Sequence, residues 1–300
     1  MSLRAELFRI GLRIFLKRRA ADLDLQAWRE EMQAIEKFVP RPPRRSQSTE
    51  ISVGALSLQR VVTPASRPKR AVLYLHGGGY VSGGPVHYRH FVWRIADALA
   101  ATVWIPSYRL APEHPFPAAL DDAVRAYAFL AGGASEAKEL VVMGDSAGGG
   151  LTLALLLKLR DSGSPLPRAA VALSPWTDLA LTGASLAENA VADPMLNATH
   201  VPEIAQLYLG GADPRTPYVS PLYGDVTGLP PVLIQVGSDE ILRDDAVRMA
   251  ERLVLGNPRS RLEVWPRMPH CWHLFAPVLP EARQAIGNIA SFIAIVTAAP

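Results

Sequence analysis

The chain has 300 residues, of which 49% are hydrophobic and 20% are charged, and its formal net charge is +3. A chain of this length can bury a large core, and α/β folds of this size often form one domain. Charges of both signs are scattered along the sequence, which excludes the concentrated basic surface of a nucleic-acid-binding protein. The single cysteine, Cys271, excludes an internal disulfide and fits a reducing compartment.

The sequence also lacks the patterns of membrane and secretory segments. No apolar run reaches the roughly 18 residues that a membrane-spanning helix needs. The N-terminal stretch MSLRAELFRIGLRIFLKRR is basic, but charged residues interrupt it. A secretory signal has an unbroken apolar core and a small-residue cleavage site, and neither is visible. We therefore expect a cytoplasmic protein without integral membrane association.

Two amphipathic helices are predicted before the first strand, over residues 3–15 and 23–37. The apolar face of the first consists of Leu3, Leu7, Ile10, Ile14 and Phe15. The simplest interpretation of the pair is a packed terminal extension, and a cap over a pocket is a second. A membrane-surface helix is a third, disfavoured by Glu6 and by the shortness of the apolar stripe. Residues 39–48, rich in Pro, Arg and Ser, predict a linker.

Short apolar strands then alternate with helices. Strands are predicted at 51–62, 71–75, 102–106, 140–143, 169–174, 231–236 and 261–266, and helices at 87–100, 118–131, 147–160 and about 281–297. This alternation predicts an α/β fold with a mostly parallel central sheet that helices cover on both faces. Residues 180–215 break the rhythm without a strand, and we interpret them as an insertion.

A serine stands between two glycines at the end of one of these strands. The segment GDSAG, from Gly144 to Gly148, fits the pattern Gly-x-Ser-x-Gly. The strand must turn into a helix within a few residues, and a larger side chain at either glycine would clash with neighbouring backbone. The positive potential at the helix N-terminus also favours negative charge near the serine. We interpret Ser146 as a catalytic nucleophile, with a plain Gly-rich turn as the alternative.

A second glycine-rich segment, LYLHGGGYVSGG at residues 73–84, follows a buried strand. A carbonyl attacked by serine becomes an oxyanion, which needs fixed N–H donors. We predict that Gly78 and Gly79 supply such donors together with Ala147, the residue after the serine. His76 is expected to brace this loop by hydrogen bonding. The alternative is a turn that only reverses the chain.

A nucleophilic serine needs a base, and the base needs an orienting carboxylate. On this kind of sheet the chain order is serine, acid, histidine. His270 follows the last predicted strand and can reach the carboxyl end of the sheet. His273 is the alternate, whereas His200 lies in the irregular insertion.

The acid is sought in QVGSDEILRDD, residues 235–245, which also follows a strand. Asp244 and Asp245 fall in a predicted helix. Asp239 and Glu240 therefore remain as adjacent candidates.

Two other chemistries are disfavoured. The pairs His87/His90 and His270/His273 have the spacing of zinc ligands, but neither contains the Glu of H-E-x-x-H. Cys271 adjoins the predicted base in a sequence with a far better nucleophile. We expect no metal and no organic cofactor.

Several motifs together point to one family. HGGGY and GDSAGG occur with YRLAPEHPFPAALDD, SPWTDL, DPRTPYVSPL, LPPVLIQVGSDEILRDD and RMPHCWHLF over about residues 45–297. In these motifs the chain resembles the hormone-sensitive-lipase-like esterases, the bacterial family IV enzymes of the α/β-hydrolase superfamily. The resemblance implies the α/β-hydrolase fold with a helical cap. Residues 1–45 would form the N-terminal part of the cap, and residues 46–300 a catalytic domain with a cap insertion at about 180–215.

The resemblance also implies the acid and the base. In the family the acid is followed by any residue, Leu, any residue and Asp, so Leu242 and Asp244 place the acid at Glu240. Family members more often carry Asp followed by Pro there, which keeps Asp239 as a rival. The family's histidine after Met-Pro corresponds to His270.

The family implies an ester hydrolase. The capped fold and the aromatic residues make the leading hypothesis a serine carboxylesterase that hydrolyses short to medium acyl esters of small molecules through an acyl-enzyme. Amide or lactone hydrolysis with the same triad is one alternative. A non-catalytic small-molecule receptor is another, but such receptors have lost the histidine that this chain keeps.

The candidate substrate-binding residues are Tyr80, Trp176 and Tyr208. Structural roles are expected for Arg109, Glu113 and Asp145, and a homodimer fits the family's habit of forming dimers.

Overall fold

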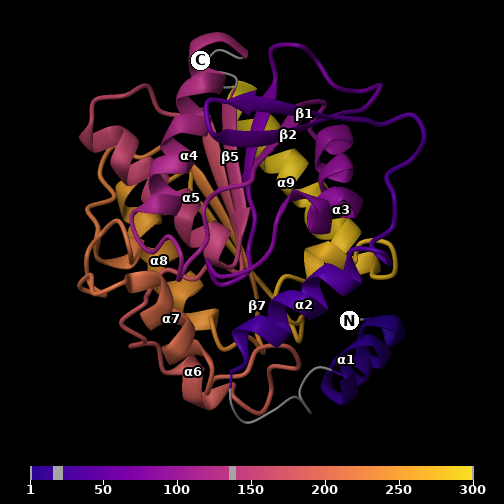
Figure 1. The fold of residues 1–300 in the computed structure, drawn as a ribbon, viewed down its shortest axis with the longest axis vertical. Coiled ribbons are helices and arrows are strands. Elements are labelled where there is room, and N and C mark those ends of the chain that lie inside the picture. Colours follow the sequence, from indigo (N-terminus) through magenta and orange to yellow (C-terminus); the bar gives the residue numbers. More distant parts are fainter. Residues whose placement is uncertain (1, 16–22, 135–139, 299–300) are drawn as a thin grey trace.

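A computed structural model describes residues 2–15, 23–134 and 140–298 of the chain. Its strands are β1 Gln47–Val53, β2 Leu56–Val62, β3 Ala71–Leu75, β4 Thr102–Pro106, β5 Leu140–Asp145, β6 Ala169–Leu173, β7 Val232–Gly237 and β8 Arg261–Trp265. In the described part of the chain they form one eight-stranded sheet of order β1-β2-β4-β3-β5-β6-β7-β8 (Figure 1). β1, β2 and β4 pair antiparallel at one edge, and all pairs from β4 to β8 are parallel.

Helices cover both faces of this sheet, as Figure 1 shows. Their bounds are α1 Leu3–Phe15, α2 Leu25–Ile35, α3 Pro85–Ala98, α4 Ala118–Phe129, η1 Leu130–Ala134, α5 Ala147–Asp161, α6 Ser185–Glu188, α7 Val201–Leu209, η3 Pro221–Tyr223, α8 Arg243–Gly256, η4 Trp272–Phe275 and α9 Pro280–Ala298. Alternate residues of β3 show the two layers, because successive strand side chains point to opposite faces. Val72 and Tyr74 pack with α3 and α9, whereas Leu73 and Leu75 pack with α4 and α5. The predicted fold class is confirmed.

The strand predictions succeed because the parallel strands are buried on both faces. Every residue of β3, β4, β5, β6 and β7 is buried, so these strands are unbroken apolar runs in the sequence. One helix begins earlier than predicted. α3 starts at Pro85, directly after Gly84, because proline at the first helical position needs no N–H partner.

The first helix forms as predicted, but it packs through the opposite face. Its apolar stripe is exposed, at Leu3 77%, Leu7 61%, Ile10 48% and Ile14 48%, whereas Ala5 and Arg9 are buried. The helix is a packed terminal extension, with Ala5 buried and Phe8 against Phe275, but it packs through the face opposite to its apolar stripe. The reason is that the polar face finds charged partners on the body: Arg9 binds Asp239, and Glu6 binds Arg267. The side chain of Phe15 lies outside the described residues.

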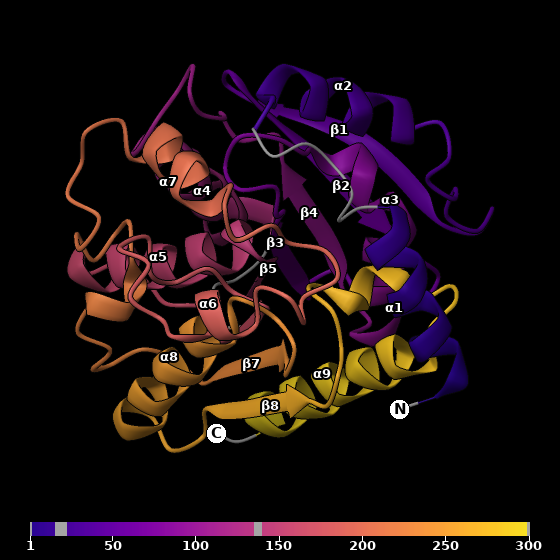
Figure 2. The same cartoon turned by 90° about the horizontal axis from the view of Figure 1, so that it is seen from below.

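The second N-terminal helix and the predicted insertion meet over the loop after β3. Among the described residues, 180–215 contain two helices, α6 and α7, and no strand. A Cβ placed on Gly79 would lie 2.8 Å from Ile204 of α7 and 3.6 Å from Trp28 of α2. Figure 2 shows α2, α6 and α7 from this side of the molecule. Both helical segments thus lie above the carboxyl ends of the parallel strands.

Candidate active site

Ser146 lies at the tight corner between β5 and α5. Its backbone has φ 53° and ψ −123°, a conformation that costs a non-glycine residue about 1–3 kcal/mol and persists where the surroundings enforce it. Two backbone hydrogen bonds enforce it: Ser146 donates to the Leu173 carbonyl at 2.8 Å and accepts from the Trp176 amide at 3.0 Å. A Cβ on Gly148 would lie 2.0 Å from the Leu75 carbonyl oxygen, so only glycine fits there. The corner holds a half-buried hydroxyl at the carboxyl end of the sheet.

Glu240 and His270 form a buried hydrogen-bonded pair. His270 Nδ1 lies 2.8 Å from Glu240 Oε2, and since an ionised carboxylate only accepts, Nδ1 carries the proton. The other oxygen, Oε1, accepts from the Gly237 amide at 2.6 Å and the Ser174 hydroxyl at 2.7 Å. Asp239 instead accepts from Arg9 and from Ser238. The structure therefore brings Glu240, and not Asp239, to the imidazole.

The pKa values of Glu240 and His270 are both raised above their ordinary values. Burial raises the pKa of Glu240, although bonds from His270, Gly237 and Ser174 oppose this. Burial acts to lower the pKa of His270, but the hydrogen bond and the charge of Glu240 outweigh it and raise that pKa above 6.5. With Nδ1–H held by the carboxylate, Nε2 is left as the acceptor that a general base requires.

Hydrogen bonds connect the histidine loop to the serine corner through neighbouring residues. The Cys271 amide donates to Ser174, and the Ser146 amide donates to the carbonyl of the adjacent Leu173. The Cys271 thiol lies 3.4 Å from His270 Nε2, and burial raises its pKa so that it stays protonated. Within the described residues, no hydrogen bond joins Ser146 Oγ to His270 Nε2. Such catalytic bonds are often long without substrate and tighten in the complex.

Ser174 is a site residue that the sequence reasoning missed. It directly follows β6, is fully buried, and has a φ of 45°. Its hydroxyl donates to Glu240 and accepts from the Cys271 amide at 3.2 Å, so it links the acid loop to the base loop. The SPWTDL motif was the available signal, but nothing local in it marks a contact 66 residues away.

The predicted oxyanion loop presents backbone donors. Gly78 has φ +118°, and a Cβ there would lie 2.2 Å from the Ser82 carbonyl oxygen. Among the described residues, the amides of Gly78, Gly79 and Ala147 donate to no protein acceptor. Ala147 is the first residue of α5, where helix geometry leaves N–H groups unpaired. The corner and the loop therefore offer free N–H donors beside each other.

Two buried groups brace this loop. His76 Nδ1 lies 2.8 Å from the Gly77 carbonyl, its ring stacks on Tyr108 with centroids 4.1 Å apart, and burial lowers its pKa to about 4. Asp145 accepts from the hydroxyls of Tyr74 and Tyr88 and from the Gly77 amide. Both residues have the bracing contacts expected of structural groups.

The three predicted substrate-binding aromatics pack together. The rings of Tyr80 and Tyr208 stack with centroids 3.7 Å apart, and Trp176 lies 6.3 Å from Tyr80. All three are at most 3% exposed. The indole N–H of Trp176 is buried and has no partner within the described part of the chain.

The remaining candidates lie apart from the pair. His273 faces Gln235 at 2.9 Å, and burial lowers its pKa to about 3. His200 directly precedes α7. Arg109 pairs with Asp122, and Glu113 pairs with Arg29. These charged residues hold loops, as expected.

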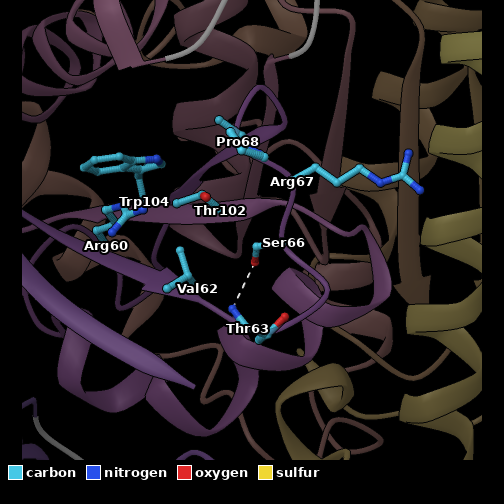
Figure 3. A pocket seen from close by; sticks show the side chains of 9 residues that line it. Arg60, Val62, Thr63, Ser66, Arg67, Pro68, Thr102 and Trp104 are labelled. Atoms are coloured by element: carbon cyan, nitrogen blue, oxygen red, sulfur yellow. Dashed lines mark hydrogen bonds between the residues drawn. The ribbon is translucent and has the colours of Figure 1, made fainter. Parts of the chain in front are cut away.

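A separate pocket of about 280 Å³ lies at the opposite, amino ends of the strands (Figure 3). Its lining includes Arg60, Arg67, Thr102 and Trp104.

The part of the chain that the structure covers holds no group of three His, Cys, Asp or Glu side chains placed to bind a metal. None of the described helices has the length and hydrophobicity needed to cross a bilayer.

Comparison with known proteins adds to this geometry. Residues 72–274 match the model of a family described as having the α/β-hydrolase fold. An acetyl-hydrolase of Streptomyces hygroscopicus is 46% identical over 236 residues, 79% of each chain. A crystal structure of an esterase from the bacterial hormone-sensitive lipase family superposes with a TM-score of 0.92, at 39% identity over 99% of both chains.

The chain belongs to the hormone-sensitive-lipase-like family of α/β hydrolases. The crystal structure of the esterase EstE5, soaked with p-nitrophenyl butyrate, superposes on the present chain with a TM-score of 0.94. The two chains are 38% identical over their whole lengths. The chain is accordingly an enzyme of the esterase class.

Proposed function

We propose that this family member is a serine carboxylesterase that hydrolyses short to medium acyl esters through a Ser146–Glu240–His270 triad. The observation that carries the proposal is the buried 2.8 Å hydrogen bond between Glu240 and His270. The next residue, Cys271, is hydrogen-bonded to Ser174, and Ser146 is hydrogen-bonded to the adjacent Leu173. A serine on an enforced corner, an oriented imidazole and free amides are the three parts that acyl transfer needs.

The reaction proceeds in two halves. His270 Nε2 takes the proton of Ser146 as Oγ attacks the ester carbonyl, and Glu240 stabilises the imidazolium that forms. The imidazolium then protonates the leaving alcohol, which leaves an acyl-serine. Water gives its proton to Nε2 and attacks the acyl carbon, and the return of that proton to Ser146 releases the acid.

The amides of Gly78, Gly79 and Ala147 stabilise the oxyanion in both halves. Their N–H groups meet no protein acceptor among the residues that the structure describes, so the transition state need not break an existing bond to use them. The fixed backbone at this corner also requires little reorganisation during the reaction.

The acyl-chain range rests on the packed aromatics and on the relatives. Tyr80, Trp176 and Tyr208 fill the space beside the first turn of α5, which favours small acyl groups. The unpaired Trp176 N–H is a buried donor that a substrate oxygen could satisfy. The similar proteins include an acetyl-hydrolase and an esterase soaked with a butyrate ester.

α2 and α7 form the cap of this site. Their contacts with Gly79 place Trp28 and Ile204 over the oxyanion loop. Arg29 of α2 donates to the Val81 and Ala111 carbonyls, and its paired bonds with Glu113 lower the pKa of that carboxyl to about 2. The cap therefore fixes the loop and screens it from water.

A substrate panel tests the proposal. Turnover of p-nitrophenyl acetate, butyrate, octanoate and decanoate should be highest for the shorter chains, and should exceed turnover of a p-nitroanilide and a lactone. Absence of turnover on every ester would overturn the proposed function, and faster anilide or lactone hydrolysis would reassign the substrate class.

A further inference from the structure

The first helix is amphipathic, but it is attached to the protein by its polar side. Arg9 is 5% exposed and binds Asp239, and Glu6 binds Arg267 and lies 3.7 Å from Arg9. Close to the beginning of the helix, the Ser2 amide donates to Glu281 of α9. These polar attachments, together with Ala5 and Phe8, occupy the inward face of α1.

The outward face of α1 is an apolar stripe. It consists of Leu3, Leu7, Ile10 and Ile14, the most exposed of which shows 77% of its surface. Spacings of three and four residues place these side chains in one row along a helix roughly 20 Å long. Figure 2 shows α1 at the periphery, beside α9 and away from the centre of the sheet.

Arginines border the stripe on both sides. Arg4 and Arg13 are exposed, and Arg13 donates to the Val191 and Ala192 carbonyls. Val191, 82% exposed, therefore extends the apolar surface next to the end of α1. Glu6, which weakened the membrane interpretation of the sequence, is occupied by its two arginine partners. An exposed apolar row bordered by arginines is typical of a helix lying in the interface of an anionic membrane.

We propose that α1 docks this enzyme onto the surface of anionic lipid bilayers, with the apolar stripe in the interface and Arg4 and Arg13 at the headgroups. Among the described residues, the exposed stripe has no apolar partner on the protein. A bilayer interface buries apolar side chains, and its anionic headgroups attract the arginines that flank the stripe. Arg9 and Glu6 connect the docked helix to Asp239 and Arg267, in the loops that carry Glu240 and His270. Docking thus brings the active-site side of the protein to the lipid. The proposal does not depend on the ester specificity proposed above.

Co-sedimentation of the full-length chain with vesicles tests the proposal. Vesicles of phosphatidylcholine containing a minor fraction of phosphatidylglycerol should pull down the wild-type protein, and high salt should weaken the binding. The double variant L7S/I10S should bind about tenfold more weakly or worse, because two large apolar side chains leave the interface. The matched control L255S/I295S changes residues that are 87% and 68% exposed elsewhere, and it should bind like the wild type.

The charge contribution is tested separately. R4Q should weaken binding to the anionic vesicles about fivefold, the effect of one arginine near such a surface, and should not alter binding to pure phosphatidylcholine. Turnover of soluble p-nitrophenyl acetate should be unchanged in all of these variants, which establishes that they are folded.

Three results would overturn the proposal. The first is a wild-type protein that stays in the supernatant at low salt. The second is an L7S/I10S variant that binds vesicles as well as the wild type does. The third is a wild-type protein that binds no vesicles but forms a dimer, which L7S/I10S converts to a monomer. The last would assign the stripe to a second copy of the chain.

Discussion

The two ends of the parallel strands differ in what they hold. At the carboxyl ends lie the buried carboxylates Asp145 and Glu240, and Ser146, Ser174 and Cys271 adopt positive φ. At the amino ends lies a pocket of about 280 Å³ whose lining includes two arginines (Figure 3). Buried charge and strained backbone are costly, and they persist where surrounding contacts enforce them. Several of these costly features accompany the candidate triad, and a pocket alone does not mark the reacting centre.

The sharpest test of this difference is removal of the Ser146 hydroxyl. S146A should lower kcat/KM for p-nitrophenyl butyrate by about 10⁴–10⁶-fold, because the acyl-enzyme of the proposed reaction forms on this hydroxyl. Alanine keeps the Cβ, so the melting temperature should not fall. If S146A retained a hundredth or more of the wild-type activity, Ser146 would not be the nucleophile.

The next largest effect should distinguish the two adjacent acids. E240Q should reduce kcat by about 10²–10⁴-fold, because a glutamine cannot hold the imidazole tautomer or balance its charge. D239N, which disturbs only the contacts with Arg9 and Ser238, should change kcat less than about threefold. Steady-state kinetics of both variants decides the assignment, and the reverse order would make Asp239 the acid.

Ser174 provides a comparison of two buried serines, one at each end of the sheet. S174A removes a donor to Glu240 and should lower kcat about tenfold with little change in KM, as expected for a bond to a charged group. The control S260A removes a hydroxyl that accepts from Val232 at the start of β7. It should lower the melting temperature and leave kcat alone. Equal effects of the two variants on kcat would remove Ser174 from the positioning of the acid.

The pH profile reports the interaction between Glu240 and His270. The base must be neutral, so activity is lost as pH falls through the pKa of His270. Because Glu240 raises that pKa, the midpoint of the acid limb of kcat/KM should lie above 6.5. In E240Q the raising charge is gone, and the limb should move to lower pH. A limb that stays in place in E240Q would mean that another group titrates.

The smallest effect is expected at the amino ends of the strands. Arg67 lines the pocket there with an exposed side chain, and R67A should change esterase turnover by less than about twofold, as surface substitutions usually do. A tenfold loss would show that this end contributes to catalysis.

The carboxyl end could be predicted from the sequence where short-range constraints decide. The strand AVLYL is an unbroken apolar run because β3 is buried on both faces, and the glycines beside Ser146 are required by backbone contacts next to them. Features that depend on distant contacts could not be predicted. Local pattern left the adjacent Asp239 and Glu240 both open. The family resemblance pointed to Glu240, and the path of the loop after β7 brings that residue to His270.

The first helix shows the same limit. Periodicity predicted its apolar face correctly, but it could not say which face packs inward, because that depends on Asp239 and Arg267, more than two hundred residues away. Ser174 was missed for the same reason, since its partners Glu240 and Cys271 come from two later loops.

The most direct measurement is the site of covalent labelling by an organophosphate ester, determined by intact mass and peptide mapping. The account predicts one phosphoryl group on Ser146, fast labelling in the wild type, slow labelling in H270A and none in S146A. Stoichiometric labelling at another residue, such as Cys271, or unchanged labelling of H270A, would contradict the triad at the carboxyl end of the sheet.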